Sequence, residues 1–128
     1  MIKVRKLKHC PYGSDIVFLM GTTAELNSYI KRHLPGCEPL GGHQRAHCIV
    51  EPPRNAHDFY HHYIALQLNQ VRASSDRHFE LAATLGHEAL HCANDILERH
   101  GVKTPADNDE PLTYYFEFIF RQVLSFAW

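Results

Sequence analysis

The sequence predicts a single α+β domain in which short apolar runs form a small sheet and the last third of the chain forms two long helices. The chain has 128 residues, 45% of them hydrophobic, which suffices for one buried core. In the first half, apolar residues alternate with polar ones or run continuously over short stretches, as in strands. From residue 76 onward they recur every three or four positions, as in helices. We therefore expect residues 1–128 to form one domain.

The first part of the chain predicts two strands and a helix. Basic and apolar residues alternate over Ile2–Leu7, which is typical of a strand with one solvated face, and Asp15–Met20 is a continuous apolar run typical of a buried strand. Thr22 and Glu25 have the spacing of a capping box, which marks the start of a helix. Pro35–Gly36 ends that helix.

Two more strands are predicted in the middle of the chain. Ala46, Cys48 and Val50 alternate with other residues, and Pro52–Pro53 closes the strand that they form. The segment Tyr63–Gln70 alternates as a strand does, although the aromatic residues around its start would also suit one face of a helix. We favour the strand.

Two helices complete the domain. Asp76–His100 shows strong helical periodicity, and Gly101 is placed to cap its end. The last helix is predicted to begin at Asp109 or Glu110, with Pro111 in its first turn.

Composition excludes several classes of function. The formal net charge is −1, which gives no general electrostatic reason to bind nucleic acid or an acidic membrane. No apolar run approaches the ~20 residues that span a bilayer, and the N-terminus lacks the apolar segment of a signal peptide. The cysteines form no C-x-x-C pair, which is typical of reduced thiols. They are Cys10, Cys37, Cys48 and Cys92. A cytoplasmic protein is expected.

The segment HEALH carries the clearest chemical signal. His87 and His91 are four residues apart on the predicted helix, so both imidazoles can reach one metal ion, and zinc binds nitrogen at ~2.0–2.1 Å. Glu88 lies about 100° round the helix from His87, beside the open position of the metal, where it can take a proton from bound water. The pattern predicts a zinc site.

The histidine-rich composition weighs against the motif. With 11 histidines, a chance H-E-x-x-H has a probability of roughly one in twenty. Its place in the best helix supports it. Gly86, in mid-helix, costs ~1 kcal/mol relative to alanine, which indicates a close approach to the backbone, by a ligand or by packing. His57, His61 and His62 could form a second metal site only on a helix, and we favour surface histidines.

A third ligand is expected from the last helix. Glu110 lies at its start, although His91 is about two and a half turns before Gly101, so Glu110 must reach back. Glu117, two turns further on, is the alternative. Asn94 and Asp95, one turn beyond His91, could hold the second nitrogen of that histidine, and a solvated polar face explains them about as well.

These motifs resemble the gluzincin pattern of the zincin metallopeptidases, in which H-E-x-x-H on one helix is followed by a glutamate ligand on the next. The stretches HEALHCANDILERHG and DNDEPLTYY are also similar to small H-E-x-x-H proteins encoded by bacteriophages. The resemblance covers about Leu81–Phe120. It implies a zincin-like fold with His87, His91 and Glu110 as zinc ligands and Glu88 as the general base.

The same resemblance suggests where a substrate binds. Zincins place a strand beside the active-site helix that pairs with an extended peptide, and Tyr63–Gln70 would serve. Tyr114 could offer its hydroxyl to an oxyanion, as tyrosines do in several zincins, although a partly buried core tyrosine is the favoured interpretation.

Three functions follow as hypotheses. The first is a zinc-dependent hydrolase, a phage or prophage peptidase in the bacterial cytoplasm. The second is a non-catalytic phage binding protein on the same scaffold, which an occluded metal site and an exposed face of Phe118, Phe126 and Trp128 would favour. The third is a metal-free domain in which HEALH is accidental.

Overall fold

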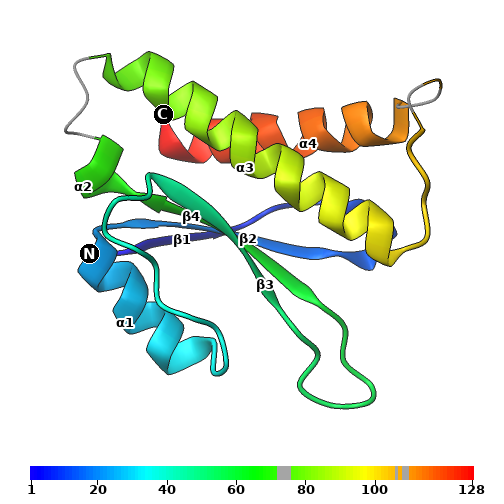
Figure 1. Cartoon of the computed structure of the whole chain (residues 1–128), viewed down its shortest axis with the longest axis horizontal. Coiled ribbons are helices and arrows are strands. Elements are labelled where there is room, and N and C mark those ends of the chain that lie inside the picture. Colours follow the sequence, from blue (N-terminus) through cyan, green and yellow to red (C-terminus); the bar gives the residue numbers. More distant parts are fainter. Residues whose placement is uncertain (72–75, 106, 108–109) are drawn as a thin grey trace.

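A four-stranded mixed sheet forms the centre of the computed structural model, which describes residues 1–71, 76–105, 107 and 110–128. The strands are β1 (Lys3–Lys6), β2 (Asp15–Gly21), β3 (Ala46–Glu51) and β4 (His61–Gln67), and a short 3₁₀ turn, η1, covers Pro11–Gly13. The helices are α1 (Thr23–His33), α2 (Leu68–Val71), α3 (Arg77–Arg99) and α4 (Glu110–Ala127). Helix α1 covers one face of the sheet, and α3 and α4 cover the other (Figure 1). The predicted α+β class with a small mixed sheet is confirmed.

The strand order places β3 at an edge of the sheet. The order is β1-β2-β4-β3, with β2 and β4 parallel in the centre and both edge strands antiparallel to their neighbours. Side chains alternate across the sheet. Phe18 and Ile64 therefore join the core under α3 and α4, whereas Leu19 and Ala65 pack against α1. Each face has its own buried cluster.

The predicted capping box at the start of α1 is confirmed. The Thr22 hydroxyl accepts from the Glu25 N–H at 3.2 Å, and the Thr22 N–H donates to Glu25 Oε1 at 3.0 Å. Leu26 and Ile30 are buried against the sheet. Local sequence thus determines where this helix begins.

The predicted strand Tyr63–Gln70 is wrong at both ends. Strand β4 begins at His61, and its last residue, Gln67, donates its N–H to Arg45 O at 2.7 Å. The chain then turns into α2, where Asn69 Oδ1 accepts from the Thr23 N–H at 3.0 Å and so helps to cap α1. The hydrogen bond between Asn69 and the start of α1 thus ends the strand earlier than the alternation of apolar and polar residues predicts. The predicted start of the last helix at Asp109 lies outside the described residues.

Helix α3 runs from Arg77 to Arg99, close to the predicted range, and Gly101 follows it with φ +71°. Gly86 lies where α4 crosses it. A Cβ atom at Gly86 would lie 2.8 Å from Cε2 of Phe120, closer than carbon atoms pack. The close approach inferred from the sequence is therefore a helix–helix packing contact.

This contact predicts opposite effects of one substitution in two backgrounds. Gly86→Ala should lower the free energy of unfolding by about 1 kcal/mol, because displacing the Phe120 ring costs more than the gain in helix propensity. In a Phe120→Ala background the same change should raise stability by about 1 kcal/mol. Urea unfolding followed by circular dichroism measures both. An equal change in unfolding free energy in the two backgrounds would show that the Phe120 ring is not the reason why position 86 requires glycine.

Candidate functional site

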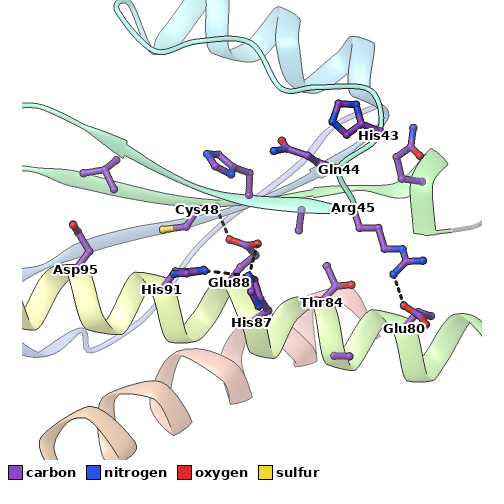
Figure 2. Close-up of a pocket in the computed structure, with 15 residues that line it drawn as sticks. His43, Gln44, Arg45, Cys48, Glu80, Thr84, His87, Glu88, His91 and Asp95 are labelled. Carbon is purple, nitrogen blue, oxygen red and sulfur yellow. Dashed lines mark hydrogen bonds and ion pairs between the residues drawn. The ribbon is translucent and has the colours of Figure 1, made fainter. Parts of the chain in front are cut away.

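A groove of about 1000 Å³ lies between β3 and α3 (Figure 2). Arg45 and Cys48 line it from the β3 side, and the Arg45 guanidinium is paired with Glu80 of α3. The remaining α3 residues in its wall follow one side of the helix: Ala83, Thr84, His87, Glu88, His91 and Asp95. The whole HEALH motif except its two apolar residues therefore faces one cavity.

The two histidines of the motif are brought together as the sequence predicts. His87 Nε2 and His91 Nε2 are 3.0 Å apart, and their rings meet edge to face (Figure 2). Two nitrogens that bind one zinc ion at ~2.0–2.1 Å in tetrahedral geometry lie roughly 3.3 Å apart. The side chain of His87 is 68% exposed. The pair thus has the separation and the access that a metal ion requires.

Glu88 lies beside this pair but is held by the sheet. Its side chain is buried, and Oε2 accepts the Cys48 N–H at 2.8 Å. The other oxygen, Oε1, is 4.0 Å from His87 Nε2. One carboxylate oxygen is therefore anchored, and the other faces the histidines. The sequence predicts the position of Glu88 next to the pair, but it contains no local signal for the anchor on β3.

The edge strand that borders the groove and α3 is β3, so the prediction that Tyr63–Gln70 offers an edge for a substrate is wrong. Strand β4 is bonded on both sides, to β2 and to β3, and has no free edge. Arg45 O and the Cys48 N–H point in opposite directions, toward β4 and toward Glu88. In an antiparallel strand this alternation continues, so Ala46 and Val50 also direct their backbone groups away from β4.

The structure does not bring the predicted third ligands to the histidine pair. Glu110 and Tyr114 line a separate pocket beside Pro11 and Tyr12, near the end of α3. Tyr114 is 67% exposed, so the favoured interpretation as a core tyrosine is wrong. Glu117 is paired with Arg121 on the surface of α4. Among the described residues, no group of three His, Cys, Asp or Glu side chains is arranged to hold a metal ion.

Of the two features expected of a non-catalytic binding protein, an exposed aromatic face and an occluded metal site, the first is present in part. Trp128 is 64% exposed, while Phe118 and Phe126 are only partly buried. The histidine pair is open to the groove instead of occluded. The occluded site expected of a non-catalytic binding protein is therefore not observed for this pair.

Asp95 does not support His91, in contrast to the prediction. Its Oδ2 accepts from His62 Nε2 at 2.6 Å and from Arg99 Nε at 2.7 Å. His62 is 3% exposed, so it is not a surface histidine. Burial lowers the pKa of His62, and the Asp95 carboxylate offsets this only in part. Burial would raise the pKa of Asp95, but the hydrogen bonds from Arg99 and His62 outweigh it and lower that pKa.

Two cysteines lie close together, Cys48 in the wall of the groove and Cys92 in the core. A hydrogen bond with the Cys48 thiol, together with burial, raises the pKa of the Cys92 thiol well above its usual value. This environment favours the protonated form of the Cys92 thiol. All four cysteines are free thiols in the structure.

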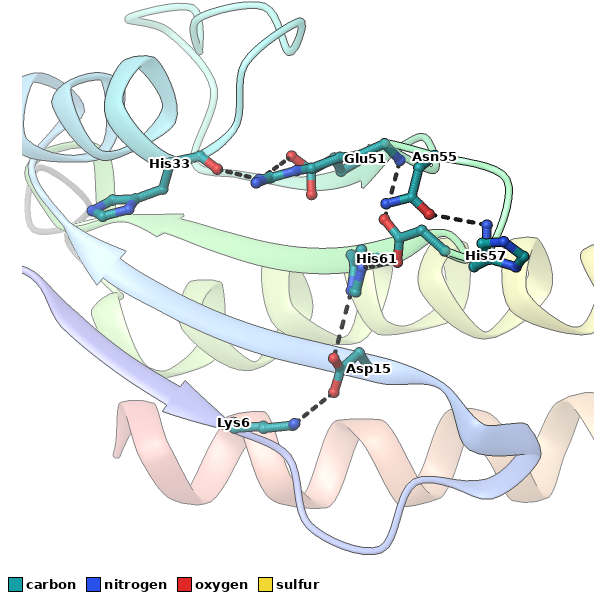
Figure 3. A network of polar contacts seen from close by, with 9 residues as sticks. Lys6, Asp15, His33, Glu51, Asn55, His57 and His61 are labelled. Atoms are coloured by element: carbon teal, nitrogen blue, oxygen red, sulfur yellow. Dashed lines mark hydrogen bonds and ion pairs between the residues drawn. The ribbon is translucent and has the colours of Figure 1, made fainter.

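Of the second group of histidines, His61 contributes its side chain to a polar network, shown in Figure 3. His61 Nε2 is 3.1 Å from Asp58 Oδ1, and His61 Nδ1 is 3.5 Å from Asp15 Oδ2. Asp15 is also paired with Lys6 of β1. His57 lies in a turn, and His61 and His62 lie in β4, so the helical condition for a second metal site is not met. The network joins β1, β2 and the start of β4.

Comparison of the chain with protein-family models, with curated proteins and with solved structures gives no match. In the described part of the chain, no helix is both long and apolar enough to cross a bilayer.

The buried His62 predicts acid sensitivity of the fold. Because its pKa in the folded state is lowered, its stabilising contribution is complete above about pH 6.5 and is lost as the pH falls through that value toward the folded pKa. His62→Gln should flatten the fall in unfolding free energy between pH 7 and pH 5. His78→Gln, at an exposed position on α3, should leave the slope unchanged. Urea unfolding at a series of pH values measures this, and an unchanged slope in His62→Gln would contradict it.

Proposed function

We propose that this chain is a zinc-dependent hydrolase that acts on peptides, with its reactive centre at His87, Glu88 and His91. The observation that carries the proposal is the pair of imidazole nitrogens 3.0 Å apart, with a glutamate oxygen 4.0 Å from one of them, in an open groove. The resemblance of HEALHCANDILERHG to phage H-E-x-x-H proteins supports it further.

His87 and His91 would hold the metal. Imidazole nitrogens are common zinc ligands, and the exposed position of His87 allows the ion to enter from solvent. When bound, zinc would polarise a substrate carbonyl and lower the pKa of a coordinated water molecule. The fit of the donor set is limited to these two side chains among the described residues.

Glu88 would move the proton. Its Oε2 is occupied by the Cys48 N–H, which leaves Oε1 to accept a proton from the attacking water. The same oxygen can then deliver that proton to the leaving amine. Because the Cys48 N–H fixes the carboxylate, Glu88 would need no rearrangement between the two transfers.

Strand β3 would hold the substrate. The backbone groups of Ala46 and Val50 point away from β4, on either side of the Cys48 N–H that binds Glu88. An extended peptide that pairs with this edge would run along the groove above the two histidines. A peptide is therefore the substrate class that the edge strand favours.

Glu110 stays the proposed third ligand on the strength of the resemblance alone. It begins α4, beyond the end of α3, while His91 lies eight residues before Arg99, roughly 12 Å along the helix axis. The start of α4 would have to approach the groove for Glu110 to bind. Zinc binding by the histidine pair and the identity of the third ligand are therefore tested by different variants.

The metal site predicts a stoichiometry. Protein purified without a histidine tag and without chelators should contain about one zinc per chain by elemental analysis. His87→Ala and His91→Ala should each lose it, whereas His78→Ala, a histidine on the same helix outside the groove, should keep it. Zinc-free wild-type protein that does not take up zinc on titration would refute the metal site.

Two further variants separate the candidate third ligands in the same assay. If Glu110 binds the metal, Glu110→Gln lowers zinc affinity by at least tenfold, and Glu117→Gln, which breaks only the surface pair with Arg121, does not. Equal affinities would assign the third position to another group and leave the histidine pair intact.

The role of Glu88 predicts a loss of turnover without loss of metal. Glu88→Gln should retain zinc and the fold while peptide hydrolysis falls by a factor of about 10²–10⁴. Glu98→Gln, on the same helix outside the groove, is the matched control. Cleavage of a peptide library, read by mass spectrometry, identifies substrates and gives relative rates. Full activity of Glu88→Gln on a substrate cleaved by the wild type would exclude Glu88 as the base.

A further inference from the structure

A second pocket, of about 420 Å³, lies at the opposite end of α3 from Arg77, where η1, the approach to β4 and the end of α3 meet. Three aromatic rings line it, those of Tyr12, Phe59 and Tyr60, and they are 48%, 50% and 37% exposed. Neither the sequence motifs nor the proposed hydrolase uses this pocket. Its walls offer flat apolar surfaces to a ligand.

Arg99 supplies a fixed positive charge in this pocket. Its Nε donates to Asp95 at 2.7 Å, and its guanidinium carbon lies 3.7 Å from the centre of the Tyr60 ring. The ion pair and the cation–π contact hold the guanidinium plane in one place. The Asp95 bond uses Nε, so the terminal Nη groups remain as donors outside that ion pair.

Two imidazoles line the same walls, and each leaves one ring nitrogen without a protein partner in the described part of the chain. His100 Nδ1 is 2.8 Å from Ile96 O, so Nδ1 carries the proton and Nε2 is left to accept a hydrogen bond from a ligand. His62 is 3% exposed, and its Nδ1 has no hydrogen-bond partner among the described residues. A buried polar atom without a partner is unusual in a folded protein.

The charges of this pocket differ from those of the groove. Glu80, Glu88 and Asp95 line the groove, whereas no aspartate or glutamate lines the second pocket in the part of the chain that the structure describes. The carboxylate that pairs with Arg99, that of Asp95, is bound at Nε and lies outside this wall, so the terminal Nη groups of the guanidinium favour an oxyanion here. The charge complementarity therefore selects an anionic ligand.

Tyr12 is held at the mouth of the pocket in a rare backbone conformation. Its φ is +60°, a region that side chains other than those of glycine seldom adopt, and such strain gathers at functional sites. Its ring stacks on Tyr115 at 5.8 Å and meets His100 at 5.4 Å. These contacts keep the ring beside the imidazole and in the wall of the pocket.

We propose that this pocket binds a small aromatic oxyanion, a planar ring that carries a phosphate or carboxylate group, with Arg99 at the anion and Tyr12, Phe59 and Tyr60 against the ring. The site is independent of the zinc-dependent hydrolase, because its residues lie outside the groove. The ring and the charge must act together, since an anion without a ring would leave the aromatic walls exposed.

Isothermal titration calorimetry with phenyl phosphate tests the proposal, with inorganic phosphate and phenol as probes that lack the ring and the charge. Phenyl phosphate should bind saturably and at least tenfold more tightly than either. Arg99→Gln should weaken it at least tenfold, and Tyr60→Leu, which leaves the Arg99–Asp95 pair intact, should weaken it severalfold. Arg121→Gln is the matched control, because Arg121 also pairs with a carboxylate four residues away on a helix.

His91→Ala separates this pocket from the groove, since a phosphate could also bind a metal there. Phenyl phosphate affinity should be unchanged in His91→Ala. Absence of saturable binding to the wild type would overturn the proposal. So would wild-type affinity in both Arg99→Gln and Tyr60→Leu, a loss in Arg121→Gln equal to that in Arg99→Gln, or loss of binding in His91→Ala.

Discussion

The burial of α3 between the sheet and α4 is the constraint on which the rest of the structure depends. Its buried side chains follow one stripe that faces the sheet and the last helix: Leu81, Leu85, Glu88, Ala89, Cys92, Ala93, Ile96 and Leu97. Gly86 lets α4 approach closely on one side, and the sheet closes the other. Because both sides are packed, the rotation of α3 about its axis is fixed. The direction in which each remaining side chain points is fixed with it.

That rotation places a carboxylate inside the packed layer. Glu88 is part of the buried stripe, and a buried charge is costly unless it is hydrogen-bonded. The Cys48 N–H meets this need, and it can do so only because β3 is an edge strand with backbone groups directed away from the sheet. One hydrogen bond thus satisfies the carboxylate and positions the edge strand over the two histidines, which stay on the open flank of the helix.

Sequence predicts the parts of this molecule that depend on near neighbours. The capping box of α1, the range of α3 and the convergence of His87 with His91 all rest on residues within four positions of each other. The strand order cannot be predicted this way. It decides that β3, and not β4, borders the groove, and it depends on pairing between residues far apart in the chain.

The positions of His62 and Glu110 both depend on residues that are distant in the sequence. His62 is buried because Asp95, 33 residues away, accepts its Nε2 hydrogen bond. A histidine in a polar stretch gives no local sign of such a partner. Glu110 begins a helix whose packing is set by apolar residues such as Tyr115 and Ile119, and that packing leaves Glu110 beside Tyr12. Sequence spacing alone selects the Glu110 carboxylate, but the packing of the apolar core determines where that carboxylate lies.

The Asp95–Arg99 pair separates two environments on one helix. Asp95 lines the groove, and Arg99, one turn on, lines the aromatic pocket. Their ion pair compensates the charge of each partly buried group. The last two turns of α3 therefore lie between the groove, which we propose to hold a metal ion, and the aromatic pocket, which we propose to bind an anion, and one ion pair links the walls of the two.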